Sequence, residues 1–280
     1  MQLEKYFKNR VVLLTGVGAG IGKEMALFLA PHVRALVLLD IRQDELQQVE
    51  LQVGNLSRPD CQIFAYATDV MDGQAIEKIR DDLGSDFFPD IIIANAGLGG
   101  INPANAFSLA VDQLMMGVNY YGMLNTFLPF VNEMVQRKKG HLAGVSSLAS
   151  LRGLPYASSY CSSKAAQTAI LESWRNDLRP FGIKVSAFLP GFVKTPMAQH
   201  KEFQMPFMID AKVCALKILN GIAGNKKIQL FPWPMKLLAI LNRNLPAIIF
   251  DFLMMNINRG KHKNSPAIFH DPRKKSAKEQ

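Results

Sequence analysis

A glycine-rich loop between a predicted strand and a predicted helix constrains the fold more than any other feature. Residues 11–14 are an apolar run that leads into Thr-Gly-Val-Gly-Ala-Gly-Ile-Gly at residues 15–22, and a helical pattern then continues to Ala30, before Pro31. The apolar run is typical of a buried parallel strand, and proline ends a helix. Glycines in such a loop allow a tight turn and let backbone N–H groups approach a phosphate at the helix N-terminus. The succession of strand, glycine-rich loop and helix predicts a dinucleotide site, with a plain structural turn as the alternative. Its candidate residues are Gly16, Gly20, Ile21 and Gly22.

Apolar runs and helical patterns alternate along most of the chain. Further strands are predicted at residues 35–39, 63–67, 91–94, 141–146, 183–189 and 227–231, with helical segments between them. This alternation predicts an α/β fold in a single domain, a doubly wound parallel sheet of the Rossmann type. Ligands of such sheets bind at the carboxyl ends of the strands, so the residues that follow each strand are the candidates for a site.

Acidic side chains follow the second and third predicted strands. Asp40 stands twenty residues after Gly20, where a carboxylate accepts hydrogen bonds from the ribose of adenosine. It would repel a 2′-phosphate, and Arg42 would soften that repulsion, so NAD is favoured while NADP stays open. Capping of the next helix is the alternative role for Asp40. Asp69, followed by Val70, would reach the adenine amino group.

Groups suited to proton transfer follow the fifth predicted strand. Tyr160 and Lys164 stand four residues apart on a helix predicted over residues 158–179, so the phenol and the ammonium share one face. A nearby cation favours the phenolate, and we therefore expect Lys164 to lower the pKa of Tyr160. Ser147 would add a hydroxyl beside the same oxygen. An ordinary amphipathic helix with a chance Tyr/Lys pair is the alternative.

Four motifs, in their order and spacing, resemble those of the short-chain dehydrogenase/reductase family over roughly residues 8–232. The family's glycine fingerprint is matched by residues 15–22, and its catalytic tetrad maps onto Asn119, Ser147, Tyr160 and Lys164. The other two motifs, an Asn-Ala-Gly turn and a Pro-Gly turn with a following threonine, are matched by Asn95, Ala96, Gly97, Pro190, Gly191 and Thr195. Ser150 departs from the pattern, because the family usually has glycine there.

The resemblance implies hydride transfer between NAD(P) and an alcohol or a carbonyl compound. Tyr160 would exchange a proton with the substrate oxygen, which Ser147 would hold. Lys164 would bind the nicotinamide ribose, and Asn119 would anchor a water that links Lys164 to solvent. Thr195 and the backbone of Val193 would hold the carboxamide of the cofactor. The alternative is a dinucleotide-binding scaffold or sensor without turnover.

The resemblance also implies a homodimer, formed by the helices predicted over residues 107–139 and 158–179. Substrate identity is expected to depend on residues 197–210, an apolar, methionine-rich stretch that is typical of an adaptable lid. We therefore expect an apolar substrate such as a lipid, a steroid or a long-chain aldehyde.

The chain beyond the predicted catalytic domain (residues 1–232) is unusual. Two short apolar helices are predicted in residues 233–257, on either side of Pro246, and both are too short to span a membrane. Residues 258–280 are basic and predicted to be disordered. The helices would cover the substrate cleft, pack against a partner subunit, or lie in a membrane interface with Trp233 at the headgroups.

Composition limits the other function classes. Lys and Arg exceed Asp and Glu by 32 to 23, which points to an anionic partner. The three cysteines are scattered and the first ten residues have no apolar core, so we expect a cytoplasmic protein, with peripheral membrane contact through residues 233–280 as an option. No spacing of His or Cys suggests a metal site, and no motif suggests nucleic-acid binding.

Overall fold

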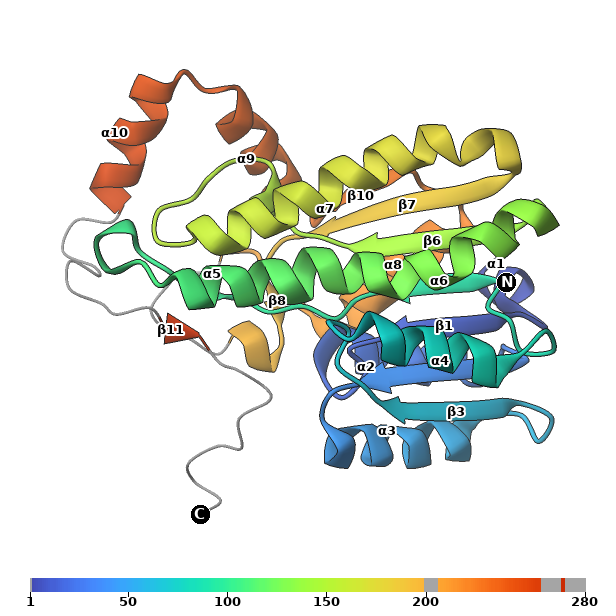
Figure 1. The fold of residues 1–280 in the computed structure, drawn as a ribbon. Coiled ribbons are helices and arrows are strands. Elements are labelled where there is room, and N and C mark those ends of the chain that lie inside the picture. Colours follow the sequence, from blue (N-terminus) through green and yellow to red (C-terminus); the bar gives the residue numbers. More distant parts are fainter. Residues whose placement is uncertain (1, 199–205, 258–267, 270–280) are drawn as a thin grey trace, which may run out of the picture.

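The computed structural model describes residues 2–198, 206–257 and 268–269. At its centre is a seven-stranded sheet of order β10-β7-β6-β4-β1-β2-β3, in which every pairing is parallel (Figure 1). The strands are β1 Val11–Thr15, β2 Ala35–Asp40, β3 Gln62–Ala67, β4 Ile91–Ala94, β6 Gly140–Val145, β7 Ile183–Pro190 and β10 Ile228–Phe231. The predicted doubly wound parallel sheet in a single domain is therefore confirmed.

Helices cover both faces of this sheet, which explains why its strands read as continuous apolar runs. Every residue of β1 and β2 is buried. One face packs against α1 Gln2–Phe7, α2 Gly20–Leu29, α3 Gln43–Leu56 and α8 Ala211–Ala223. The other packs against α4 Gly73–Leu83, α6 Gly122–Arg137 and α7 Ser158–Asp177.

The helix predicted over residues 107–139 is interrupted in its middle. It comprises α5 Leu109–Met116, a π-helical turn η2 Gly117–Tyr121, and α6. Such turns insert an extra residue into an α-helix and are frequent at functional sites. This one carries Asn119, which is fully buried. The apolar periodicity on both sides of the turn hides it in the sequence.

The carboxyl ends of β1, β4 and β6 lie side by side. Leu14 pairs with Ile93, and Ala94 pairs with Gly144, so the residues after these strands meet at one edge of the sheet. The sheet grows in opposite directions from β1 and β4, which makes their boundary the switch point where ligands of doubly wound sheets bind. The candidate residues are placed at this edge.

Two further helices lie at the same edge (Figure 1). They are α9 Trp233–Asn244 and α10 Ala247–Ile257, separated at Pro246 as predicted, and we call them the C-terminal hairpin. Among the described residues, no helix is both long and apolar enough to cross a membrane.

Two small sheets were not predicted. β8 Val193–Lys194 pairs with β9 Ile209–Asp210, and β5 Gly100–Ile101 pairs with β11 Ile268–Phe269. β11 lies within the tail predicted to be disordered, and its two residues pair with β5. The other residues of that tail, and residues 199–205 of the predicted lid, lie outside the described residues.

Candidate active site

The glycine-rich loop is locked against the turn that follows β4. The side-chain Nδ2 of Asn95 donates to the carbonyls of Thr15 and Gly16, each at 3.1 Å. The Thr15 hydroxyl oxygen accepts from the backbone N–H groups of Asn95 and Ala96, also at 3.1 Å. Gly16 has a φ of +69°, and a Cβ on Gly22 would lie 2.0 Å from the Gly16 carbonyl. Gly16 and Gly22 therefore cannot be replaced by larger residues without a shift of the loop, and the position of the loop before α2 suits a pyrophosphate.

Asp40 closes the loop on the side of β2. One carboxylate oxygen accepts from the backbone N–H of Gly18 at 2.7 Å, and the other accepts from the backbone N and the Nε of Arg42 at 3.0 and 3.1 Å. Arg42 also contacts Glu45 at 3.4 Å. The carboxylate is thus fixed beside the loop, where the ribose of adenosine would lie, and the guanidinium is engaged by two carboxylates.

The acid predicted to reach adenine follows β3. Asp69 accepts a hydrogen bond from the backbone N–H of Met71 at 2.9 Å, which orders the turn before α4. Val70 is buried, and its Cγ2 lies 2.5 Å from the place where a Cβ on Gly122 would stand. The turn after β3 is therefore packed against the start of α6.

Ser147 and Tyr160 face one another across the loop between β6 and α7. They share a hydrogen bond, which lowers the pKa of the phenol, although burial has the larger effect and raises it. Ser146 is turned the other way, since its hydroxyl contacts the Lys164 carbonyl at 3.0 Å and the Thr168 hydroxyl at 2.8 Å. Ser147 is therefore the hydroxyl beside Tyr160.

Lys164 lies one turn further along α7 and is only 4% exposed. Its Nζ donates to the Val145 carbonyl at 3.1 Å and lies 5.9 Å from the ring centre of Tyr160. Burial lowers the pKa of Lys164 to about 7. Burial also raises the pKa of Tyr160, so the net shift is opposite to the lowering predicted from the Tyr/Lys pair, because a low-dielectric surrounding disfavours the charged form of each group.

Asn119 joins η2 to α7. Its side-chain oxygen accepts from the Leu98 N–H at 2.7 Å, and its Nδ2 donates to the Leu98 carbonyl at 3.0 Å and to the Ser163 hydroxyl at 2.9 Å. Its backbone carbonyl accepts from the side chain of Gln167 at 2.6 Å. A carbonyl oxygen has two lone pairs, so the backbone oxygen of Asn119 can accept a hydrogen bond from the water that the resemblance implies in addition to the one from Gln167.

The turns after β4 and β7 complete the edge. A Cβ on Gly97 would lie 3.0 Å from the Asn119 side-chain oxygen and 3.3 Å from the Nζ of Lys164, so a larger residue there would crowd both groups. Thr195 lies over Gly20, where a Cβ would meet its methyl group at 2.9 Å. Pro190 ends β7, and β8 begins at Val193.

Ser163 and Gln167, which hydrogen-bond to Asn119, shape the site and were missed in the sequence. Tyr160, Ser163, Lys164 and Gln167 follow the spacing i, i+3, i+4, i+7, which places one polar stripe on a single face of α7, and the last three of these side chains are buried. Met197 belongs to the predicted lid: its sulfur lies 3.0 Å from the position of a Cβ on Gly99, and the Tyr160 ring lies 3.8 Å from the same position. The polar stripe was visible in the sequence, whereas the place of Met197 depends on the tertiary fold.

A family model described as short chain dehydrogenase matches residues 10–205. The chain belongs to the short-chain dehydrogenase family. An uncharacterized oxidoreductase of Myxococcus xanthus is 31% identical over 86% of this chain and 95% of that protein. The dehydrogenase/reductase SDR family member 7B of Xenopus tropicalis is 29% identical over 69% of this chain and 64% of that protein. The family resemblance noted in the sequence is thereby confirmed.

The fold agrees with solved structures. A short chain dehydrogenase/reductase of Burkholderia phymatum, in complex with NAD, superposes with a TM-score of 0.75 at 22% identity and covers 85% of this chain and 94% of that one. This short-chain dehydrogenase is accordingly an NAD(P)-dependent oxidoreductase. Among the described residues, no group of His, Cys, Asp and Glu is placed to hold a metal ion.

The arrangement suits proton transfer at one oxygen atom. A bound nicotinamide supplies or accepts the hydride. Because burial raises its pKa, Tyr160 keeps its proton near neutral pH, which is the state a general acid needs. Ser147 is placed to donate a second hydrogen bond to an oxygen held by Tyr160.

We predict that Tyr160→Phe lowers turnover by a factor of about 10²–10⁴, the usual contribution of general acid–base catalysis, because the proton carrier is lost. Dinucleotide binding should stay nearly unchanged, since the glycine-rich loop is untouched. Initial rates and a titration of NADH fluorescence measure the two effects. Tyr66→Phe, on the edge strand β3, is the matched control. A Tyr160→Phe enzyme with the wild-type rate would contradict the role of the phenol.

Proposed function

We propose that this enzyme transfers hydride between NAD and an apolar alcohol, ketone or aldehyde, such as a lipid, a steroid or a long-chain carbonyl compound. The hydrogen-bonded pair of Ser147 and Tyr160 beside buried Lys164 carries the proposal. Tyr160 is the general acid or base, Ser147 holds the substrate oxygen, and Lys164 binds the nicotinamide ribose. Asn119 orders η2 and anchors the relay water through its carbonyl.

Asp40 supports the choice of NAD over NADP. Its buried carboxylate would lie beside a 2′-phosphate and repel it. Arg42 is held by Asp40 and Glu45, which leaves it poorly placed to neutralise that phosphate. Asp69 and the glycine-rich loop would hold the rest of the adenosine, while Thr195, Val193 and the Pro190-Gly191 turn would hold the nicotinamide end.

The apolar substrate class is supported by the side chains around Tyr160. Met197 and the Tyr160 ring both lie close to Gly99, and Leu148 and Met235 both approach Gly191, each 3.3 Å from the position of a Cβ there. A methionine-rich, adaptable wall suits a substrate with a hydrocarbon body. A dinucleotide-binding scaffold is the second candidate, and the presence of all four tetrad residues argues against it.

A panel of apolar ketones and aldehydes, assayed with NADH and with NADPH, tests this function. We expect turnover with NADH to exceed turnover with NADPH, and Asp40→Ala to narrow the difference, because the repelling carboxylate is gone. Glu77→Ala, an exposed residue of α4, is the control for a general loss of negative charge. A wild type that prefers NADPH would contradict the role of Asp40. Dinucleotide binding without turnover on any substrate would favour the scaffold.

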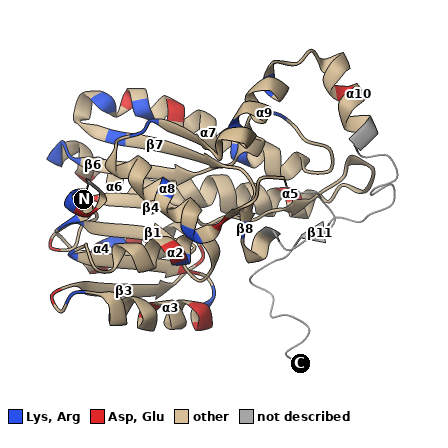
Figure 2. Cartoon of the chain, turned by 180° about the vertical axis from the view of Figure 1, so that it is seen from behind, with Lys and Arg blue, Asp and Glu red and all other residues tan. Residues whose placement is uncertain are grey.

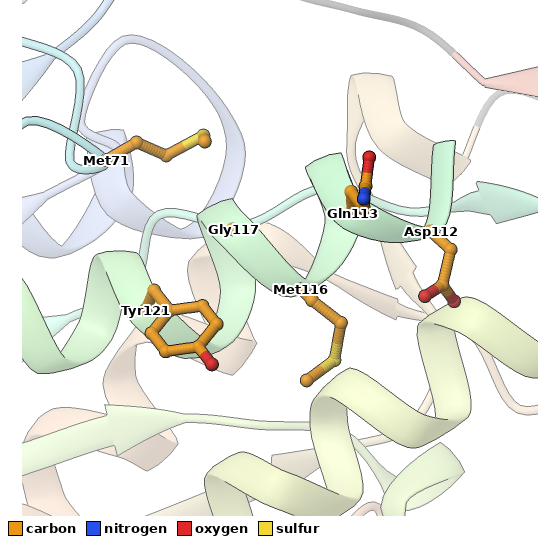
Figure 3. Close-up of a pocket in the computed structure, with 6 residues that line it drawn as sticks. All are labelled: Met71, Asp112, Gln113, Met116, Gly117 and Tyr121. Atoms are coloured by element: carbon orange, nitrogen blue, oxygen red, sulfur yellow. The ribbon is translucent and has the colours of Figure 1, made fainter. Parts of the chain in front are cut away.

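We also propose a homodimer formed through α5, α6 and α7. Leu109, Tyr121 and Leu128 are exposed apolar side chains on this part of the fold. A hollow of about 520 Å³ lies beside them, lined by Met71, Asp112, Gln113, Met116, Gly117 and Tyr121. Asp112, Met116 and Tyr121 project from the same side of the helix (Figure 3). Exposed apolar patches of this kind are typical of protein interfaces.

Light scattering tests the assembly. We expect the mass of a dimer at micromolar concentration, and Leu128→Arg should shift it to a monomer by placing a charge in the interface. The matched control is Leu51→Arg on α3, which also replaces an exposed leucine. A monomeric wild type would refute the proposal.

For localisation, we propose a cytoplasmic enzyme that contacts membranes peripherally through residues 233–280. The C-terminal hairpin carries three charged residues, Lys236, Arg243 and Asp251 (Figure 2), and its exposed apolar side chains include Trp233, Ile248 and Phe252. Lys236 and Arg243 lie on α9, and the sequence after the hairpin has seven Lys or Arg against two acids. Apolar side chains next to basic ones are the two signals that reversible binding to anionic lipid needs.

Co-sedimentation with vesicles that contain phosphatidylserine tests this contact. We expect the full chain to bind at low salt and to be released at high salt, because the basic residues contribute through a screened attraction. The double variant Ile248→Ser/Phe252→Ser should bind less. The control is Leu51→Ser/Leu56→Ser, which replaces two exposed residues of α3. Equal sedimentation of wild type and hairpin variant would rule out the membrane role and leave a lid or an interface.

A further inference from the structure

Arg152 connects the catalytic loop to both helices of the C-terminal hairpin. It stands five residues after Ser147, in the loop between β6 and α7. Its Nη1 donates to the backbone carbonyl of Asn242 and, at 2.8 Å, to that of Leu245. These carbonyls lie at the C-terminal end of α9, where a helix leaves carbonyl groups without partners inside the helix. The guanidinium thus caps α9.

The same guanidinium also holds α10. Its central carbon lies 3.8 Å from the ring centre of Phe250. Phe250 is 7% exposed, whereas its neighbours Ile248 and Phe252 are 80% and 67% exposed. Phe250 is therefore a buried point of contact between α10 and Arg152. A guanidinium stacks on an aromatic ring while its N–H groups donate in its own plane, which is the combination seen here.

The N-terminal half of α9 lies against the turn after β7 and close to the catalytic loop. Met235 packs against Gly191, in the turn after β7, and Leu148 of the catalytic loop approaches Gly191 from another side. Leu148 directly follows Ser147, whose hydroxyl oxygen accepts from the Ala149 N–H at 3.2 Å. The hydrogen bond from the Ala149 N–H to Ser147 thus orders the start of the catalytic loop, and Arg152 orders the end of α9.

We propose that Arg152 is a positioning residue that fixes the C-terminal hairpin to the catalytic loop, so that α9 forms one wall of the cleft for the apolar part of the substrate. Loss of Arg152 frees the end of α9 and releases Phe250, but it leaves Ser147, Tyr160 and the dinucleotide loop in place. Arg152 therefore governs the affinity for the apolar substrate far more than the chemical step.

Hydrogen exchange and steady-state kinetics on the full chain test this role. In Arg152→Ala we expect faster amide exchange confined to residues 242–257, and a KM for the apolar substrate about tenfold higher with kcat and NADH affinity nearly unchanged. Arg152→Lys should lie between this variant and wild type, because lysine keeps the charge but lacks the planar fork. Phe250→Leu should change exchange in the same direction. Adding Phe250→Leu to Arg152→Ala should raise the exchange rates little further, since the two residues act as a pair.

The matched control is Arg80→Ala, which breaks the exposed ion pair with Asp81 on α4. Wild-type exchange and KM in Arg152→Ala would overturn the proposal. Faster exchange throughout the sheet, or a fall in kcat equal to the rise in KM, would also overturn it, because either result indicates a general structural role. The kinetic part rests on the proposed function, whereas exchange needs no substrate. Absence of turnover in wild type would therefore refute the function and leave the exchange result as the test of Arg152.

Discussion

Burial of Lys164 is the constraint on which the site depends. A lysine in this position needs a hydrogen-bond acceptor at its ammonium, and the Val145 carbonyl at the end of β6 provides one. That contact fixes the rotation of α7 against the sheet. The rotation in turn carries Tyr160 to Ser147, and brings Ser163 and Gln167 to Asn119. Lys164 is thus positioned by the same packing that aligns the other three members of the tetrad.

The same burial makes both ionisable groups easier to keep neutral. The pKa of Lys164 is about 7 and that of Tyr160 is raised, so the site holds a phenol with its proton and an amine close to its titration point. Spacing in the sequence placed the two groups on one face, and this was correct. It did not show that the face points inward, which reverses the expected direction of the Tyr160 pKa.

The strands and the glycine-rich loop were predictable because their conformations depend on short, continuous stretches of the sequence. Runs such as Val11–Thr15 are buried on both faces, and Gly16 needs a left-handed φ. The π-helical turn was not predictable, since it depends on distant contacts: Gly117 accommodates Met71, and Gly122 accommodates Val70. The pairing of β11 with β5 and the contacts of Arg152 with α9 each join residues that are ninety or more positions apart. No local pattern encodes such contacts.

Transfer of a labelled hydride is the most direct test of the chemistry at this site. The enzyme would be incubated with an apolar ketone and NADH that carries deuterium at both C4 positions of the nicotinamide, and the alcohol would be analysed by mass spectrometry. Hydride transfer beside Tyr160 predicts one deuterium atom on the carbinol carbon, and formation of this product about 10²–10⁴-fold more slowly in Tyr160→Phe. An unlabelled alcohol, or a labelled one formed equally well without the phenol, would contradict it.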